Sequence, residues 1–361
     1  MKVIVTGASG CLGQYLVKLL IENADEVKEI VAVDARKFCP TIQMNLDLKK
    51  FLFVECDIRE VSKMEPLFKG VDCVFHTAAL VSIGHFPDRA GMKDINENGT
   101  RIVVELSRRF NVPYLVYTST ADVMMGRKGN LVNATEALVL PPPDLKFMIH
   151  PYALTKFMAE NIALSADGLT LNDGKRVLRT LSLRPATLYG EGDRHFVVNT
   201  MLQAKASGGV LNRMGPSSAK FAAVYVGNAA WAHIVAMRAL MQRPGEVAGE
   251  AYVITDDTKP QNIFDFLTPF YTARGFTVSD RSVPYCIVIL FAFVFQCFVW
   301  LLSWVWKWKS APIPPVNELR YCGHTYTFNI SKARERLGYA PLFSFDDGLR
   351  NSIQFYSDVK I

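Results

Sequence analysis

A glycine-rich turn separates the first apolar run of the chain from its first helical pattern. The turn reads TGASGCLG over residues 6–13, and its glycines have the spacing G-x-x-G-x-x-G. Glycine is needed where a chain turns sharply, where backbone approaches a phosphate closely, and where a helix packs against a strand. The N-terminus of the next helix offers free N–H groups and partial positive charge to a phosphate. The turn therefore predicts a dinucleotide site, with the candidate cofactor-binding residues Gly7, Gly10, Cys11, Leu12 and Gly13.

Short apolar runs alternate with helical patterns through the first half of the chain. Six runs are predicted to be strands, namely residues 3–5, 30–33, 51–54, 73–75, 114–117 and 181–183. Helices are expected at 12–21, 100–110, 152–164, 196–206 and 226–241, and one more strand at 251–254. Strands that are apolar on both faces and alternate with helices indicate a buried parallel sheet. Because crossovers are right-handed, the predicted fold class is α/β, with a doubly wound parallel sheet of the Rossmann type.

An acidic residue, Asp34, ends the second predicted strand about 20 residues after the turn. A carboxylate there accepts hydrogen bonds from both ribose hydroxyls and repels a 2′-phosphate, which favours NAD as the cofactor over NADP. Arg36 follows two residues later, and its guanidinium can accommodate such a phosphate, so NADP stays open.

Two further strand ends supply candidate cofactor residues. Asp57 and Ile58 follow the third strand, where we expect the carboxylate to hydrogen-bond the adenine and the isoleucine to pack against it. The alternative for Asp57 is a plain helix N-cap. Ala78 follows the fourth strand and is small enough for the backbone to pass close to the cofactor.

Tyr152 and Lys156 stand four residues apart, on one face of a predicted helix. A free phenol has a pKa near 10 and is a poor base at neutral pH. A nearby ammonium, together with a positive nicotinamide ring, is expected to lower the pKa of Tyr152. The phenolate can then accept the proton of a substrate alcohol as hydride leaves its carbon. Ser119 and Thr120 close the fifth strand, where ligands bind in parallel sheets, and either hydroxyl can hold the substrate oxygen.

Residues 283–306 form an uncharged apolar stretch. A helix of this length reaches across the ~30 Å hydrocarbon core of a bilayer. Trp300, Trp304, Trp306 and Trp308 crowd its C-terminal end, as interfacial aromatic residues do. The alternative is a buried core helix. We predict membrane attachment and leave open whether the segment spans the bilayer or dips into one leaflet.

The regularity fades after residue 186, which suggests a division of the chain. We predict that residues 1–185 form an NAD-binding Rossmann domain to which residues 225–256 return. Residues 186–361 are predicted to form a smaller substrate-binding region that contains the membrane-associated segment.

The charge and cysteine content exclude several classes of function. The net charge is +6, but no long run of Lys or Arg accompanies it, so no nucleic-acid partner is expected. The seven cysteines are scattered and are predicted to be small buried hydrophobes rather than disulfides. The six histidines lack ligand spacing, so no metal is expected. The N-x-[S/T] sites at Asn98, Asn133 and Asn329 are not expected to be glycosylated.

The motifs together resemble an extended short-chain dehydrogenase/reductase, and more narrowly the 3β-hydroxysteroid dehydrogenase/isomerase family. They are TGASGCLG (6–13), DI (57–58), HTAA (76–79), INENGT (95–100), YTST (117–120), YALTK (152–156) and RPATLYG (184–190). The narrower resemblance depends on YVGNAAWAHI (225–234), KARERLGYAP (332–341) and the apolar segment. The stretch ADVMMG (121–126) departs from many relatives in its methionines, so we expect the substrate pocket to differ there.

The resemblance implies a role for each matching residue. Tyr152 corresponds to the catalytic acid/base and Lys156 to its partner, which also binds the nicotinamide ribose. Thr120 falls on the hydroxyl that holds the substrate oxygen, with Ser119 beside it. Asn96 falls on the asparagine that supports the lysine through its helix, and Pro185 on the residue that passes near the nicotinamide.

The implied activity is an NAD-dependent oxidation of the 3β-hydroxyl of a steroid or sterol to a ketone, to which a Δ5–Δ4 isomerisation can be added. The alternatives are a decarboxylating sterol-4α-carboxylate 3-dehydrogenase and a non-catalytic dinucleotide-binding scaffold. A reductase of flavonoid or sugar-nucleotide type is a third, which the apolar segment disfavours because soluble nucleotide sugars need no membrane anchor. The expected location is the endoplasmic reticulum membrane, or else a mitochondrial membrane, with the catalytic domain facing the cytosol. A homodimer stays open.

Overall fold

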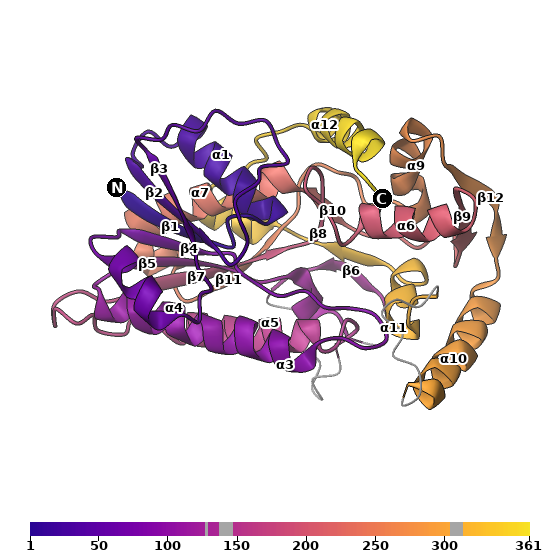
Figure 1. The fold of residues 1–361 in the computed structure, drawn as a ribbon, viewed down its shortest axis with the longest axis horizontal. Coiled ribbons are helices and arrows are strands. Elements are labelled where there is room, and N and C mark those ends of the chain that lie inside the picture. Colours follow the sequence, from indigo (N-terminus) through magenta and orange to yellow (C-terminus); the bar gives the residue numbers. More distant parts are fainter. Residues whose placement is uncertain (127–128, 137–146, 304–312) are drawn as a thin grey trace.

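A parallel sheet forms the centre of the protein (Figure 1). The computed structural model describes residues 1–126, 129–136, 147–303 and 313–361. Within these residues, seven parallel strands are hydrogen-bonded in the order β11-β7-β5-β4-β1-β2-β3. They are β1 (Lys2–Thr6), β2 (Glu29–Asp34), β3 (Phe51–Glu55), β4 (Cys73–His76), β5 (Tyr114–Thr118), β7 (Arg179–Pro185) and β11 (Ala251–Ile254). The strand order proceeds outward from β1 in both directions, which confirms the predicted doubly wound fold.

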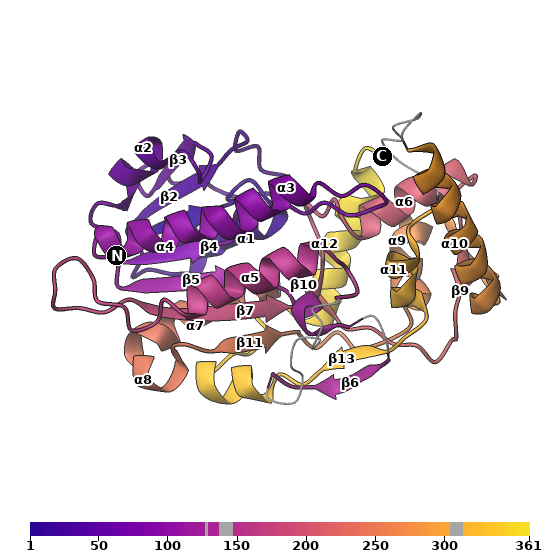
Figure 2. The same ribbon diagram turned by 90° about the horizontal axis from the view of Figure 1, so that it is seen from below.

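Apolar side chains cover both faces of this sheet, as the strand pattern predicted. Val3 and Val5 of β1 pack into one hydrophobic cluster and Ile4 into the other, because successive side chains of a strand point to opposite faces. One face packs against α1 (Cys11–Asn23) and α7 (Val226–Gln242). The other is covered by α4 (Gly99–Arg109) and α5 (Tyr152–Leu164), which lie side by side across it (Figure 2).

Strand β3 differs from the expectation that every strand is buried. Leu52 is half exposed, and Phe53 and Val54 are only partly covered. The reason is position, since β3 pairs only with β2 and forms the edge of the sheet.

The elements beyond the sheet are mostly short, and the sequence predicted few of them. The additional strands are β6 (Leu131–Ala134), β8 (Thr187–Tyr189), β9 (Val210–Met214), β10 (Ala223–Tyr225), β12 (Thr277–Val283) and β13 (Tyr326–Phe328). The longer helices are α6 (Val197–Ala206), α9 (Ile263–Ala273), α10 (Tyr285–Leu302) and α12 (Phe345–Asp358). The single-turn helices are α2 (Val61–Met64), α3 (Arg89–Met92), α8 (Pro244–Val247) and α11 (Val316–Leu319). The 3₁₀ helices are η1 (Glu65–Phe68), η3 (Ala121–Met124) and η4 (Arg320–Cys322), and the π-helices are η2 (Lys93–Asn98) and η5 (Ala333–Leu337).

Three parallel strand pairs join distant parts of the chain: β8 with β10, β9 with β12, and β6 with β13. The last pair brings the C-terminal segment against a loop that leaves β5. Strands β6, β8, β10 and β13 have only three or four residues, which is too short to show a period, whereas β9 and β12 carry polar residues among their apolar ones; this is why they were not predicted.

Helix α10 is exposed, so the alternative of a buried core helix is wrong. Only Ala292 and Val299 of its 18 residues are buried, whereas Leu290 and Trp300 are 64% and 78% exposed. Its length and composition would allow it to cross a membrane. It lies at the end of the molecule far from the N-terminus (Figure 1). The predicted aromatic positions Trp304, Trp306 and Trp308 lie outside the described residues.

The segments before and after α10 both contact the rest of the protein. Strand β12, which precedes the helix, pairs with β9. After the helix, the N–H of Val316 donates to Gln296 Oε1 of α10 at 3.2 Å, so that α11 packs against it. The segments before and after the apolar helix are therefore both attached to the same body of the protein.

The cysteines are less buried than predicted. Cys56 and Cys73 are buried, but Cys39, Cys286 and Cys297 are exposed, and all seven are free thiols. Cys286 and Cys297 are exposed because they lie on α10.

An aromatic cluster joins the C-terminal helices to the strands of the second region. The ring of Phe270 on α9 lies 4.9 Å from that of Tyr356 on α12 and 6.2 Å from that of Tyr189 on β8, measured between centroids. All three side chains are almost fully buried. The edge-on packing of Phe270 against Tyr356 stabilises the core beyond the area that it buries.

We predict that Phe270→Ala lowers the free energy of unfolding by about 3–5 kcal/mol, because it leaves a cavity among these rings. The measurement is urea unfolding of the full chain in a mild detergent, followed by tryptophan fluorescence. The matched control, Leu202→Ala on the exposed face of α6, should change that free energy by less than about 0.5 kcal/mol. Equal effects of the two substitutions would show that α9 and α12 do not pack as described.

Candidate active site

The glycine turn forms one wall of a cavity of about 460 Å³. A Cβ atom at Gly13 would lie 2.2 Å from the carbonyl oxygen of Gly7, and one at Gly7 would lie 2.7 Å from the backbone of Ala78. Gly7 also has a φ of +71°, which favours glycine. The turn can therefore close onto α1 only without side chains at these positions, and it presents bare backbone to the cavity. This cradle fits the phosphates of a dinucleotide.

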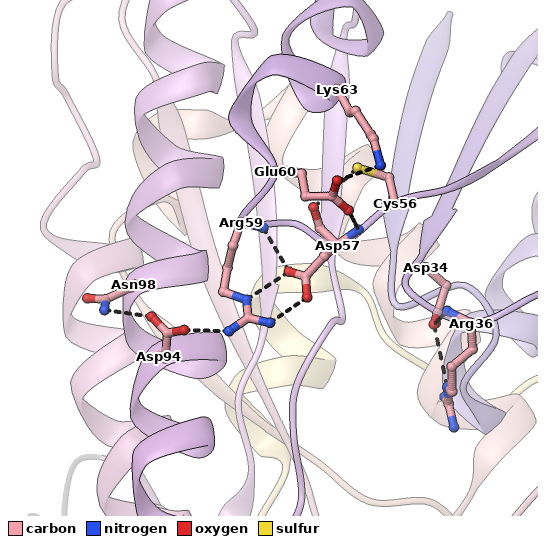
Figure 3. A network of polar contacts seen from close by, with 9 residues as sticks. All are labelled: Asp34, Arg36, Cys56, Asp57, Arg59, Glu60, Lys63, Asp94 and Asn98. Carbon is pink, nitrogen blue, oxygen red and sulfur yellow. Dashed lines mark hydrogen bonds and ion pairs between the residues drawn. The ribbon is translucent and has the colours of Figure 1, made fainter.

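Asp34 lies beside the turn with both carboxylate oxygens placed by backbone N–H groups. Ser9 donates to Oδ2 at 3.0 Å and Arg36 donates to Oδ1 at 2.9 Å. The Arg36 side chain is largely exposed, lines the cavity, and has its Nε 3.5 Å from Oδ1 (Figure 3). A carboxylate and a guanidinium thus adjoin the position predicted for the ribose.

Asp57 and Ile58 do not reach the cavity. Arg59 donates to both oxygens of Asp57, at 2.9 and 2.6 Å, and also binds Asp94 (Figure 3). These contacts hold the pKa of Asp57 below its usual value. The Asp57 N–H donates to Glu60 at 3.1 Å, but Asp57 is not the N-cap of α2, because Glu60 holds that position. Ile58 packs in the core beside Gly99. The adenine contact expected of these two residues stays a prediction.

Tyr152 and Lys156 both line the cavity. Lys156 is buried, with Nζ donating to the carbonyl oxygen of Thr118 at 2.6 Å and lying 4.4 Å from the ring centroid of Tyr117. Burial lowers the pKa of Lys156 to about 7, against the opposing effect of the Glu160 carboxylate one turn away.

The expected lowering of the Tyr152 pKa is not found. Burial raises the pKa of Tyr152 above its ordinary value of 10, and the negative charge of Asp122 raises it further. The prediction from sequence took account of the Lys156 ammonium. It did not consider the Asp122 carboxylate or the hydration that the Tyr152 phenol loses on burial. Lys156 directs its ammonium to the Thr118 carbonyl instead.

Asn96 lies outside the cavity but contacts helix α5 between the two catalytic candidates. Its Nδ2 donates to Thr155 Oγ1 at 2.9 Å and to the carbonyl oxygen of Leu80 at 3.1 Å, while its Oδ1 accepts from the Leu80 N–H at 2.8 Å. Thr155 in turn donates to the carbonyl oxygen of Tyr152 at 2.9 Å. The π-helical turn η2 carries Asn96 to this point. The contacts agree with a supporting position.

Ser119 and Thr120 both line the cavity, but their hydroxyls are in different states. Thr120 caps η3, accepting from the Asp122 N–H at 3.2 Å and donating to Asp122 Oδ2 at 3.1 Å. The Ser119 hydroxyl is buried and has no hydrogen-bond partner among the described residues. A buried hydroxyl without a partner is costly unless a ligand satisfies it. The geometry therefore favours Ser119 as the free donor.

Of the remaining candidates, Gly10, Cys11, Leu12 and Pro185 line the cavity, and Ala78 lies against Gly7 at its edge. The carboxyl ends of β1, β5 and β7 thus bring the glycine turn, Ser119, Thr120 and Pro185 to one edge of the sheet, where α5 adds Tyr152 and Lys156.

Sequence reasoning missed the part of the cavity that comes from the C-terminal half. The apolar lining includes Leu211, Met214, Phe221, Ile263, Phe264, Leu267, Leu319 and Phe328. Two polar residues were also missed, Asp122 and Tyr321, whose phenol donates to Asp122 Oδ1. Asp122 was detectable, since it stands two residues after Thr120. Nothing in the local pattern around Tyr321 indicates a site.

Known proteins resemble this chain over most of its length. A sequence model of the 3-beta hydroxysteroid dehydrogenase/isomerase family matches residues 4–285. The chain is 28% identical to 3 beta-hydroxysteroid dehydrogenase type 7 of Mus musculus, over 98% of this chain and 94% of that protein. It is 32% identical to short-chain dehydrogenase/reductase family 42E member 1 of Homo sapiens, over 93% of this chain and 83% of that protein.

Solved structures share the fold at lower identity. Pal from Bacillus thuringiensis superposes with a TM-score of 0.70 at 20% identity, over 100% of both chains. A double mutant of DesIV, a dTDP-glucose 4,6-dehydratase from Streptomyces venezuelae with NAD and DAU bound, superposes with a TM-score of 0.69 at 19% identity, over 99% of this chain and 97% of that one. Identities this low show the fold alone. The match of the family model over most of the chain carries the assignment: the chain belongs to the 3-beta hydroxysteroid dehydrogenase/isomerase family, as its motifs predicted.

Proposed function

We propose that this protein is an NAD-dependent oxidoreductase that oxidises the 3β-hydroxyl of a steroid or sterol to a ketone. The observation that carries the proposal is the meeting of Tyr152, Lys156 and the unpartnered Ser119 hydroxyl in the cavity that the glycine turn borders. Bound NAD would supply the acceptor for the hydride of the carbinol carbon. Gly7, Gly10, Cys11, Leu12 and Gly13 are the residues proposed to hold its phosphates, Asp34 its ribose, and Pro185 to lie near its nicotinamide.

The side chains of the cavity supply the proton chemistry. Ser119 donates its free hydroxyl to the substrate oxygen and orients it, and Thr120 lies beside it. Tyr152 accepts the proton of the substrate hydroxyl, while Lys156, one helical turn away, contributes positive charge when protonated. Asn96 holds α5 through Thr155 and so fixes the spacing of the two. Burial of these groups excludes water from the reacting atoms.

The lining of the cavity supports a steroid or sterol over a nucleotide sugar. Its C-terminal wall is built of leucine, isoleucine, methionine and phenylalanine side chains, which match an apolar ring system. The decarboxylating 3-dehydrogenase of a sterol 4α-carboxylate uses the same first step and remains the alternative substrate class. Product mass separates the two reactions, because only the second loses carbon dioxide.

The exposed apolar helix supports association with a membrane, proposed to be that of the endoplasmic reticulum with the catalytic domain facing the cytosol. Because β12 and α11 hold both flanks of α10 to the same body, we propose that the helix dips into one leaflet rather than spanning the bilayer. In this arrangement an apolar substrate can reach the cavity from the membrane.

Tyr152→Phe should lower kcat for oxidation of a 3β-hydroxysteroid by about 100- to 10,000-fold, since the proton acceptor is lost. Because burial keeps the pKa of Tyr152 high, the neutral phenol predominates at pH 7, and kcat/KM of the wild type should rise about tenfold per pH unit between about pH 7 and 9. The measurement is NADH absorbance over that range. Undiminished turnover by the variant would contradict Tyr152 as the proton acceptor, whereas a lack of turnover by the wild type would favour the scaffold alternative.

Asp34→Ala should reduce the preference for NAD over NADP, measured as the ratio of the two kcat/KM values, by about tenfold or more, because a repulsive carboxylate is removed. Arg36→Ala is the matched control and should change the ratio in the opposite direction, as it removes the cation beside the ribose position. An unchanged ratio in Asp34→Ala would contradict the assigned role of Asp34.

Leu290→Glu combined with Phe298→Glu should weaken binding to phosphatidylcholine vesicles by about tenfold or more, because charges on the exposed face of α10 must then enter hydrocarbon. The measurement is co-sedimentation of the purified chain with vesicles. Leu202→Glu, on the exposed surface of α6, is the control and should bind as the wild type does. Equal binding of all three proteins would exclude α10 as the anchor.

A further inference from the structure

Two basic residues, Arg194 and His195, line the cavity but take no part in the proton chemistry of the proposed reaction. They belong to the loop that joins β8 to α6, outside the segments from which cofactor residues were predicted. Both side chains are exposed, and neither has a hydrogen bond or an ion pair within the part of the chain that the structure describes. An unpaired guanidinium at a cavity wall is suited to bind an anionic group of a ligand.

The loop lies against the first residue of α1, which is Cys11. A Cβ atom at Gly192 would lie 3.0 Å from the Cys11 Cβ and 2.9 Å from Thr41 Oγ1, and the φ of Gly192 is +83°. This close approach therefore requires glycine. Burial raises the pKa of the Cys11 thiol to about 12, and the charge of Arg194 is among the effects that oppose this rise. The positive charge of Arg194 thus acts at the N-terminus of α1, beside the phosphate cradle.

Asp193 fixes the backbone from which the Arg194 side chain extends. Its Oδ1 accepts the N–H of His195 at 2.8 Å, and its Oδ2 accepts the N–H of Val197 at 2.7 Å. Oδ2 also accepts the phenol of Tyr356 on α12 at 3.1 Å. Both oxygens of this carboxylate are therefore engaged by the loop and by α12, while the guanidinium next to it stays free of an ion pair.

The neighbouring basic groups differ from Arg194 in their charge state or their partners. Partial burial lowers the pKa of His195 below its ordinary value of 6.5, and Arg36 and Arg194 lower it further, against the opposing charge of Asp193. At neutral pH the imidazole is therefore uncharged. Arg36 has its Nε 3.5 Å from Asp34 Oδ1, so its charge has a partner. Of these three groups, Arg194 alone offers an unpaired positive charge.

We propose that the Arg194 guanidinium binds the diphosphate of NAD, so that the glycine turn and the loop before α6 hold this group together. The N-terminus of a helix supplies only about half a positive charge, whereas a diphosphate carries two negative charges. A guanidinium adds a full charge and can donate two parallel hydrogen bonds to phosphate oxygens. The inference rests on the proposed function only for the use of NAD and is independent of the substrate.

The 2′-phosphate of NADP has the same chemistry and is the other phosphate that could meet Arg194. The contact of the loop with Cys11 favours the diphosphate, because phosphates are expected at the N-terminus of α1 and the ribose hydroxyls at Asp34. The two phosphates can be separated by experiment, since NADPH carries both and NADH carries the diphosphate alone.

The experiment titrates the full chain in a mild detergent with NADH and follows the nicotinamide fluorescence, so that no substrate is needed. Arg194→Ala should raise the Kd for NADH by about 10- to 100-fold, because a charge-assisted contact is lost. Arg194→Lys should restore part of the affinity, since it keeps the charge but not the planar fork. Arg108→Ala on α4 removes an arginine that does not line the cavity and should bind NADH as the wild type does.

Further measurements assign the effect to the diphosphate. ADP-ribose, which carries the diphosphate without nicotinamide, should displace NADH with an affinity that Arg194→Ala lowers by the same factor. The Kd for NADPH should rise by that factor too. Added salt should weaken NADH binding to the wild type more than to Arg194→Ala, because one charge pair fewer is screened in the variant. The midpoint of urea unfolding should be the same in both proteins, since the side chain is exposed.

Three results would overturn the inference. An unchanged Kd for NADH in Arg194→Ala would show that the guanidinium does not bind the cofactor, and a loss confined to NADPH would assign it to the 2′-phosphate. A loss for NADH but not for ADP-ribose would assign it to the nicotinamide half. Each of these leaves the proposed function intact, whereas a wild-type protein that binds no dinucleotide would contradict the proposed function itself.

Discussion

The hydrogen bond from Lys156 Nζ to the carbonyl oxygen of Thr118, at 2.6 Å, joins helix α5 to the end of β5. It fixes where Tyr152 lies relative to the strand end that carries Ser119. A second contact, from Asn96 to Thr155, holds the same helix from the side of η2. The position of Tyr152 relative to Ser119 therefore depends on a helix that buried polar contacts hold to the sheet.

Burying an ammonium at this point has an electrostatic cost that neighbouring groups offset. Lys156 is 2% exposed, and its lowered pKa reflects the loss of hydration. Glu160, one turn later on α5, is also buried and accepts two hydrogen bonds from Arg184, through Nε at 2.9 Å and Nη2 at 2.8 Å, and one from Ser182 at 2.7 Å. The charges of α5 and β7 thus compensate one another beneath the cavity, and removal of one partner would leave an unpaired buried charge.

The sequence predicted those parts of the fold and site whose residues stand close together in the chain and follow a recognisable pattern. The glycine turn, the strand ends and the i, i+4 pair on α5 are each specified within a few residues. Asp57 shows the limit of such reasoning, because Arg59 binds its carboxylate, a contact that the predicted role did not consider. Tyr321 shows a second limit, since it meets Asp122 across 199 residues, through a chain path that no local period encodes.

The segment that supplies Tyr321 also connects the apolar helix to the cavity. Residues 313–322 follow α10, pack against it through Val316, and line the cavity with Leu319. In the same segment, Glu318 accepts the N–H of Gly84 at 2.6 Å and so ties the loop after β4 to this wall. If α10 rests in a membrane, an apolar substrate that leaves the bilayer meets this wall first. The segment that α10 holds in place is thus also part of the cavity wall, far along the chain from the glycine turn.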